Sequence, residues 1–459
     1  GHRMMQKIAK NQWKPINDIN EKEPQDGYDI ISTIDVYIQD IAHHALLKQL
    51  EYYSADHGCV VVMETKTGQI KAISNLGRAE DGSYYEKDNF AIKESQEPGS
   101  TFKLMDLIAV LDDKKADTGT VYNSFGGEVQ YYGRRVRDSH KGGYGKISLA
   151  RGFEVSSNTV LVQSVYESYK NNPKQFVDRI NSYGLNKPLG LPIKGEGIPV
   201  IPQPGTNRWS GVSLPWMAFG YGLSVTPLQT LTLYNAVAND GVMVKPIFVS
   251  EIKEWNKTIK KFDTQVINPK ICSQETLDKV HAVLENVVKK GTGSKLYSKD
   301  FSMAGKTGTA QVNYKDKSQL YYASSFVGYF PADEPKYSCI VVVHKPNVAA
   351  GYYGADVAGP VFKRIAQKIF TDSPSTNHVK NIDAKVVSQE KNYSEYYKKV
   401  EKEERIVPNV KGMDGMDAVA LLENLGLKVK VIGVGRVKKQ SLTSGQAFNK
   451  NQTIIIELS

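Results

Sequence analysis

The stretch SMAGKTGTAQV (residues 302–312) is followed by SSFVGYFPA (324–332) and YSCIVVVHKP (337–346), with connections of eleven and four residues between the three runs. Short apolar runs rich in Val, Ile, Phe and Tyr are typical of β-strands. Because the connections are short, we expect the three strands to be neighbours in an antiparallel sheet. The helical period of GPVFKRIAQKIF (359–370) then predicts a helix that closes the domain.

The amino-terminal part of the chain predicts further elements of the same domain. IQDIAHHALLKQLEYY (38–53) has apolar residues at helical spacing, and GCVVVMET (58–65) and QIKAISN (69–75) are two strand-like runs. From about 100 to 240 the pattern is mostly helical, with Gly- and Pro-rich loops. The strands thus come from the two ends of this domain and the helices from its middle. A sheet of this kind packed with helices predicts an α+β fold.

Composition limits the classes of function. A chain of 459 residues with 40% hydrophobic residues can bury the core of one large domain and a smaller one. The net charge is +10, yet no basic run is interleaved with aromatic residues, so we expect no nucleic-acid partner. Cys59, Cys272 and Cys339 are too few and too scattered for a disulfide framework or a CxxC metal site.

The polarity of the chain changes after Phe370 and predicts the domain boundaries. We expect a large domain over residues 31–372 and a polar linker over 373–404, which has few apolar anchors. Over 405–459 an apolar helix stopped by a glycine precedes strand-like runs, which predicts a small α+β module. No apolar run is long enough to span a bilayer.

EPGSTFKLMDLIAVL (97–111) places Ser100 and Lys103 one helical turn apart, after a Pro-Gly entry and before an apolar stripe. A serine nucleophile needs a base within hydrogen-bond reach, and this spacing puts both side chains on one helix face. We expect the helix macrodipole to favour a developing oxyanion and to lower the pKa of Lys103. The pattern alone is weak, since Ser250-Lys253 and Ser388-Lys391 repeat it; their contexts, a strand-like run and the polar linker, indicate chance.

Ser156-Ser157-Asn158 precedes an apolar helical run, whereas a second Ser-x-Asn, Ser375 to Asn377, lies in the linker. A hydroxyl and a carboxamide two residues apart on a loop can both face one cleft. Ser156 would then relay a proton, and Asn158 would hold Lys103 and a substrate amide. An ST-turn or a helix cap made by Ser156 or Ser157 is the structural alternative.

Lys-Thr-Gly occurs twice. At Lys66 to Gly68 it joins two strand-like runs, which predicts a hairpin turn with a solvated lysine. At Lys306 to Gly308 it continues as KTGTAQ inside a strand, where small residues allow another backbone to pair. Lys306 would meet a substrate carboxylate and help to keep Lys103 neutral, and Thr307 and Thr309 would donate hydrogen bonds.

Together, STFK, SSN and KTGTA resemble the signature set of penicillin-binding proteins and serine β-lactamases. Ser157 stands where the usual motif has Asp, which points away from β-lactamases. The resemblance covers roughly residues 25–370 and is to the class B, monofunctional transpeptidases. The terminal module resembles a PASTA domain, which some cell-division members carry.

The resemblance implies a peptidoglycan D,D-transpeptidase of septal wall synthesis that β-lactams inhibit. The implied catalytic set is Ser100, Lys103, Ser156, Asn158 and Lys306; Thr307, Gly308 and Thr309 bind substrate; no cofactor or metal is needed. The backbone N–H groups of Ser100 and Thr309 would form the oxyanion hole.

Such proteins usually have an amino-terminal membrane anchor and a pedestal domain, so we expect residues 1–30 to be a pedestal remnant. The expected location is the extracytoplasmic face of the bacterial membrane, the periplasm. Expected partners are stem peptides, β-lactams, cell-division membrane proteins and a glycosyltransferase. Two alternatives stay open: a D,D-carboxypeptidase or β-lactamase, and a non-catalytic penicillin-binding receptor or scaffold.

Overall fold

The computed structural model describes the whole chain except residues 1–4, 10–11, 16–26, 256, 317 and 373–404. The chain divides into two compact units, Gly1–Ser373 and Pro374–Ser459. Each unit has a hydrophobic core of its own. The expected linker over 373–404 lies outside the described residues, as does much of the expected pedestal remnant over 1–30.

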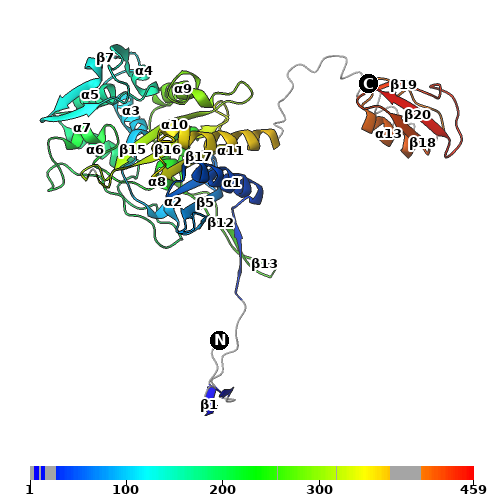
Figure 1. Cartoon of the computed structure of the whole chain (residues 1–459), viewed down its shortest axis with the longest axis horizontal. Helices are drawn as coiled ribbons and strands as arrows, with labels where there is room; N and C mark the ends of the chain where they lie inside the picture. Colours follow the sequence, from blue (N-terminus) through cyan, green and yellow to red (C-terminus); the bar gives the residue numbers. More distant parts are fainter. Residues whose placement is uncertain (1–4, 10–11, 16–26, 256, 317, 373–404) are drawn as a thin grey trace. The chain divides into compact units, whose positions relative to one another are not determined.

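A six-stranded antiparallel sheet is the centre of the large unit (Figure 1). Its strands come from both ends of the unit, as predicted, and the runs after residue 300 are neighbours in the predicted antiparallel order. In spatial order the strands are β15 (Ala304–Val312), β16 (Tyr321–Phe330), β17 (Tyr337–His344), β4 (His57–Glu64), β5 (Ile70–Arg78) and β6 (Tyr84–Glu86).

Alternating residues of the central strands face two different layers of helices. Val60 and Val62 of β4 pack with α1 (Val36–Tyr53) and α11 (Gly359–Asp372), the predicted first and closing helices. Val61 and Met63 pack instead with helices from the middle of the chain. This alternation is the consequence of the strand pleat. The sheet with helices packed on both faces confirms the predicted α+β class.

The helices of the middle of the chain form one large buried cluster. The most central is α3 (Lys103–Asp112), in which every residue from Lys103 to Leu111 is buried. The remaining helices of the unit are α2 (Phe90–Lys93), η1 (Gly99–Thr101), η2 (Phe125–Gly127), α4 (Leu149–Glu154), α5 (Asn158–Tyr169), α6 (Pro173–Ser182), α7 (Ser213–Met217), α8 (Pro227–Ala238), α9 (Gln274–Lys290), η3 (Ser294–Leu296) and α10 (Gly354–Val357).

Several small sheets are also present in this unit. The largest of them pairs β3 (Asp29–Ser32) with β12 (Val249–Glu254), which also pairs with β13 (Lys257–Lys261). The two-stranded sheets are β1 (Met5–Ala9) with β2 (Gln12–Pro15), β7 (Val121–Asn123) with β10 (Lys146–Ser148), β8 (Glu128–Tyr131) with β9 (Arg134–Arg137), and β11 (Met243–Val244) with β14 (Val266–Asn268).

In the described part of the small unit, one helix packs against three strands. Its helix is α13 (Gly415–Asn424), and Gly426 follows it with φ 89°, a left-handed conformation that suits glycine and ends the helix as predicted. The strands β18 (Lys428–Ile432) and β20 (Thr453–Leu458) are parallel neighbours. The third, β19 (Val437–Gln440), has the sequence VKKQ, which was too polar to be predicted as a strand.

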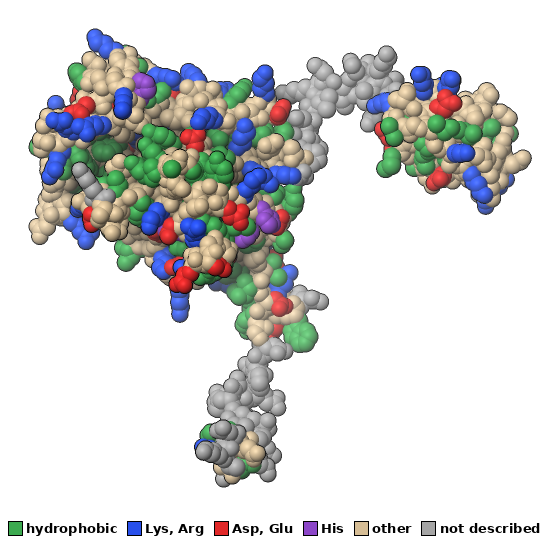
Figure 2. All heavy atoms as spheres, in the orientation of Figure 1, with side chains coloured by type: hydrophobic (Ala, Val, Ile, Leu, Met, Phe, Trp, Pro, Cys, Tyr) green, Lys and Arg blue, Asp and Glu red, His purple; other side chains and the backbone are tan. Residues whose placement is uncertain are grey.

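The surface of the described units is mixed in charge. On the face that Figure 2 shows, Lys and Arg side chains are dispersed among acidic ones and do not gather in one basic patch. Within the described part of the chain, no helix is both long and apolar enough to cross a bilayer. Cys59, Cys272 and Cys339 are all free thiols in buried positions.

Candidate active site

Ser100 lies in the 3-10 turn η1, which leads directly into the buried helix α3. The turn begins at Gly99, whose φ of 56° is left-handed, and Gly99 N–H donates to Gly220 O at 3.1 Å. Thr101 and Lys103 are buried, whereas Ser100 is only partly buried. The expected helix start is therefore a tight turn that presents Ser100 at the edge of the core.

Lys103 is completely buried, and its amine is held by the Ser156–Asn158 loop. Its Nζ donates to Ser156 O at 2.8 Å, to Ser156 Oγ at 3.2 Å and to Asn158 Oδ1 at 2.5 Å. The structure thus brings together the first two predicted motifs, which are separated by about fifty residues of chain.

The pKa of Lys103 is lowered to about 7, and burial is the main cause. The negative charges of Asp138 and Asp106 act in the opposite direction and raise it. We had expected the helix macrodipole and the second lysine to lower this pKa; the loss of hydration in a closed core is the main cause. A lysine with a pKa near 7 has a substantial neutral fraction at neutral pH and can accept a proton.

The two serines of the second motif, Ser156 and Ser157, have different roles. Ser157 is the N-cap of α5, and its Oγ accepts a hydrogen bond from Val160 N at 3.2 Å. The alternative of a helix cap is therefore correct for Ser157. Ser156 precedes it with φ 58°, an uncommon conformation for a residue with a Cβ. Strained conformations of this kind cluster at functional sites, and here the strain turns Ser156 Oγ toward two lysines.

Asn158 is engaged on both sides of its carboxamide. Its Oδ1 accepts from Lys103, and its Nδ2 donates to Arg137 O at 2.7 Å. We had expected this amide to serve Lys103 and a substrate amide; the structure shows the first contact, and places the backbone of Arg137 on the other side. Asn158 therefore fixes the position of the Lys103 amine.

The third motif lies in β15, which is an edge strand of the central sheet. Thr309 and Gln311 pair with Ser324 and Tyr322 of β16. The N–H of Gln311 points away from β16, since it donates to Tyr221 Oη at 2.8 Å. Backbone directions alternate along an antiparallel strand, so the N–H and C=O of Thr309 also point to the free edge. An extended peptide can add there as a further strand.

Lys306 is completely buried and points to the same serine as Lys103. Its Nζ donates to Ser156 Oγ at 2.9 Å and to Thr307 O at 3.1 Å. Burial, and then repulsion from the charge of Lys103, hold the pKa of Lys306 well below its ordinary value. The Ser156 hydroxyl is therefore the nearest side-chain partner of the amine, and the expected contact of Lys306 with a substrate carboxylate stays a prediction.

The remaining residues of the third motif connect the strand to its surroundings. Thr307 Oγ1 is 2.7 Å from Thr292 Oγ1, and Thr309 Oγ1 accepts from Gly354 N at 3.0 Å. A Cβ at Gly308 would lie 2.2 Å from Ser325 Oγ and 2.9 Å from Thr101 Cγ2. Gly308 is therefore needed for close packing of β15 against the turn that carries the serine.

Comparison with known proteins agrees with this arrangement. A family model described as the penicillin binding protein transpeptidase domain matches residues 58–367, which is more than half of the chain and includes all three motifs. The chain belongs to the penicillin-binding protein transpeptidase family. A second model, of the PASTA domain, matches residues 405–459.

Named relatives and solved structures support the same family. Stage V sporulation protein D of Bacillus subtilis is 29% identical over 98% of this chain and 68% of that protein. The peptidoglycan D,D-transpeptidase FtsI of Escherichia coli is 28% identical over 76% of this chain. The chain spans only 57% of the length of FtsI. The crystal structure of penicillin-binding protein 3 from Mycobacterium tuberculosis is similar with a TM-score of 0.67, at 25% identity, over 78% of this chain and 82% of that one.

The other copies of the three motifs lie elsewhere in the transpeptidase domain or outside the described residues. Lys66 forms an exposed ion pair with Asp240 at 2.7 Å in the turn between β4 and β5. Ser250 lies on β12, where its Oγ donates to Ile31 O at 3.0 Å. Ser388-Lys391 and Ser375 to Asn377 fall in the segment that is not described.

Sequence reasoning missed Asp138, which supports the second motif of the transpeptidase domain. Its carboxylate accepts from Ser157 Oγ at 3.0 and 3.1 Å, from Thr159 N at 2.9 Å and from Thr159 Oγ1 at 2.9 Å. The carboxylate thus sits at the amino end of α5 and orients the loop that holds Lys103. No spacing pattern links Asp138 to this loop, so only the fold could assign it.

Proposed function

We propose that the chain is a serine-type peptidoglycan D,D-transpeptidase that works through an acyl-enzyme on Ser100 and is acylated by β-lactams. The observation that carries the proposal is the meeting of two buried lysines, from the first and third motifs, on the Ser156 hydroxyl of the second. The Nζ atoms of Lys103 and Lys306 lie 3.2 and 2.9 Å from Ser156 Oγ. Such a group can move a proton without any metal or cofactor in the steps described.

In the first step, neutral Lys103 accepts the Ser100 hydroxyl proton as Ser100 Oγ attacks the penultimate D-alanine carbonyl carbon of a stem peptide. The carbonyl oxygen becomes an oxyanion, and we assign its stabilisation to the N–H groups of Ser100 and Thr309. The outward direction of Thr309 N–H on the edge strand supports that assignment. The C–N bond to the terminal D-alanine then breaks.

The leaving amine needs a proton, and Ser156 is placed to pass one from the lysines. In the second step, the amine of a neighbouring stem peptide attacks the acyl carbon and loses a proton to the same group. The ester C–O bond to Ser100 then breaks, and Ser100 Oγ takes a proton back from that group. Thr307 and Thr309, with Gly308 between them, line the edge to which the stem peptide would add as a strand.

The decisive experiment is labelling with a fluorescent penicillin followed by mapping of the modified peptide. We expect a single modified residue, Ser100; label on Ser250 or Ser388 would disprove the assignment. A long-lived acyl-enzyme would exclude a β-lactamase. Release of D-alanine with an amine-dependent product separates a transpeptidase from a carboxypeptidase, in which water is the acceptor, and from a non-catalytic receptor.

We further propose that the enzyme acts in septal wall synthesis at the extracytoplasmic face of the bacterial membrane, with cell-division membrane proteins and a glycosyltransferase as partners. One observation favours a second candidate role in sporulation: the match to Stage V sporulation protein D covers 98% of this chain. Localisation of a fluorescent fusion at vegetative and at sporulation septa would distinguish the two.

We also propose that residues 31–372 act independently of the PASTA domain over 405–459. The PASTA unit has a core of its own, and no member of the three motifs lies in it. Deleting residues 405–459 should leave the acylation rate nearly unchanged. A truncated chain that folds but loses most of its penicillin reactivity would contradict this independence.

A further inference from the structure

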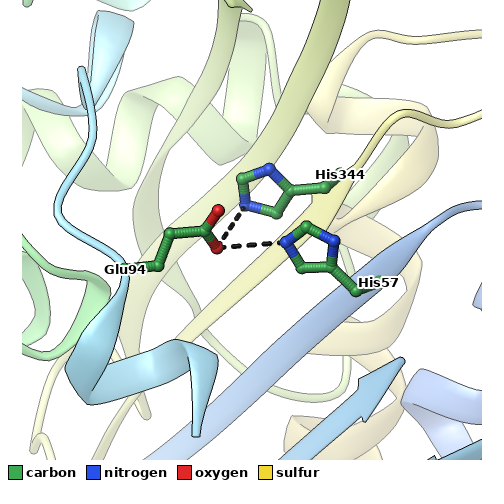
Figure 3. A group of neighbouring side chains, drawn as sticks. All are labelled: His57, Glu94 and His344. Carbon is green, nitrogen blue, oxygen red and sulfur yellow. Dashed lines mark hydrogen bonds and ion pairs between the residues drawn. The ribbon is translucent and has the colours of Figure 1, made fainter. Parts of the chain in front are cut away.

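Two histidines and a glutamate meet at one end of the central sheet, away from the three motifs. His57 is the first residue of β4, and His344 is the last residue of β17. The two are direct cross-strand partners, and their rings stack with centroids 4.2 Å apart. Glu94 comes from the segment between α2 and η1, and it points toward both rings (Figure 3).

The distances between the three donor atoms suit a small cation. Glu94 Oε2 lies 3.1 Å from His57 Nε2 and 3.5 Å from His344 Nε2, and all three atoms lie within 4.8 Å of one another. Two ligands about 2.0–2.1 Å from a tetrahedral Zn²⁺ lie roughly 3.3–3.4 Å apart. The two distances from Glu94 Oε2 are therefore already close to those in a zinc site. The third distance, between His57 Nε2 and His344 Nε2, has to shorten.

Both Nε2 atoms already take part in hydrogen bonds. Gln96 Nε2 lies 3.1 Å from His344 Nε2, so this nitrogen accepts a hydrogen bond from the amide through its lone pair. His57 Nδ1 lies 2.8 Å from Asp56 Oδ2, and its Nε2 lies 3.1 Å from Glu94 Oε2, so each carboxylate can accept a hydrogen bond from the ring. A cation would replace the hydrogen bonds at both Nε2 atoms, and because the two imidazole planes are parallel to within 7°, one ring has to turn for both lone pairs to meet the cation beside Glu94.

The surroundings of His57 resemble the outer shell of a zinc site, whereas Nδ1 of His344 is buried without a hydrogen-bond partner. A histidine ligand commonly donates its other ring N–H to a carboxylate, which fixes the tautomer, as Asp56 does for His57. His344 is almost fully buried, His57 is mostly buried and Glu94 is partly exposed, so one side stays open for a water or a fourth ligand. A flip of the Gln96 amide would bring its oxygen to this position.

We propose that His57, Glu94 and His344 bind one divalent transition-metal ion, with Zn²⁺ the best fit to two imidazoles and a carboxylate. The ion would connect the ends of β4 and β17 to the segment that runs through Glu94 and Gln96 to Ser100. Its role is structural: it fixes the approach to the serine turn without touching the reacting atoms. The proposal does not depend on the function proposed above, because it concerns metal binding alone.

The test is a calorimetric titration of Zn²⁺ into the whole chain after treatment with a chelator. We expect one site per chain, and tetrahedral absorption bands when Co²⁺ replaces Zn²⁺. Glu94→Gln and His57→Gln keep the size of the side chain, and each should weaken binding by more than about 100-fold; Asp56→Asn should weaken it by about 10–100-fold. Circular dichroism and the acylation rate establish that each variant is folded.

The matched control is His44→Ala, which removes a different histidine–carboxylate contact, the exposed pair of His44 with Asp40 at 3.3 Å. It should leave the zinc affinity unchanged. Absence of a stoichiometric site in the folded wild-type chain would overturn the proposal and leave a proton shared within the group as the explanation of the contacts. Binding that persists equally in Glu94→Gln and His57→Gln would place the metal elsewhere, for example at the amino-terminal His2, and would also overturn it.

Discussion

The two Lys-Thr-Gly segments have the same three residues and opposite surroundings. Lys66 stands in the turn between β4 and β5, with 65% of its side chain exposed and a pair with Asp240 on the surface. Lys306 lies in an edge strand, completely buried, and donates to Ser156 Oγ. Burial changes the chemistry of the amine, because a desolvated lysine loses its proton far more readily than a hydrated one. We therefore expect the tripeptide to be functional only where the fold removes water from its lysine.

The largest effect should come from the buried lysine of the first motif. Lys103→Ala removes the base nearest in sequence to Ser100, and loss of a general base typically costs 10²–10⁴-fold in rate. We expect the second-order rate of acylation by penicillin to fall by about that factor. The thermal midpoint, measured beside it, should remain that of a folded protein. A folded Lys103→Ala protein that is acylated at the normal rate would mean that another group is the base.

A smaller but still large effect is expected at the second buried lysine. Lys306→Ala should lower the acylation rate by about a hundredfold, because the Ser156 hydroxyl loses its 2.9 Å partner. Lys306→Met is the matched control, since it refills most of the volume without donating a hydrogen bond. Recovery of the rate in Lys306→Met would show that a cavity, and not the missing amine, causes the loss.

The pH dependence of acylation tests whether burial makes Lys103 a base. Its pKa is about 7, and only the deprotonated amine can accept the Ser100 proton. The rate should therefore rise with pH up to about 7 and level off above it, with a fall of about tenfold per pH unit on the acidic side. A stopped-flow series with a chromogenic β-lactam measures this profile. A rate that keeps rising toward pH 10 would indicate a lysine with its ordinary pKa.

The smallest effect should be that of the exposed copy. Lys66→Ala removes one partner of a surface ion pair, and such changes usually alter stability by no more than about 0.5 kcal/mol. Neither the acylation rate nor the thermal midpoint should change measurably. If Lys66→Ala and Lys306→Ala lose activity equally, the surroundings do not distinguish the two segments.

The sequence predicted what depends on local pattern. The apolar runs after residue 300 became β15, β16 and β17, and the helices at 38–53 and 359–370 became α1 and α11. Strand pairing was predictable because the connections are short. The polar strand β19 was not predictable, since VKKQ carries little hydrophobic signal and is defined by its pairing with β20.

The candidate site likewise contains residues that the sequence predicted and residues that it did not. The three motifs identified the residues that meet at Ser156, because each motif is a short string. Asp138 was missed because its contacts to Ser157 and Thr159 depend on how β9 is placed beside α5. His57, Glu94 and His344 were missed for the same reason, as they are brought together by strand register from distant parts of the chain.

The edge position of β15 has a consequence for the solubility of the protein. An unpaired strand edge invites pairing with other chains, and the opposite edge of the same sheet ends in the three-residue strand β6, which offers little to pair with. β15 has nine residues but exposes mainly Thr309, Gln311 and Val312, because η1 packs against the strand and Tyr221 occupies Gln311 N–H. The open edge is thus limited to about the length of a short peptide, which protects the folded protein from edge-to-edge aggregation while leaving room for one extended ligand.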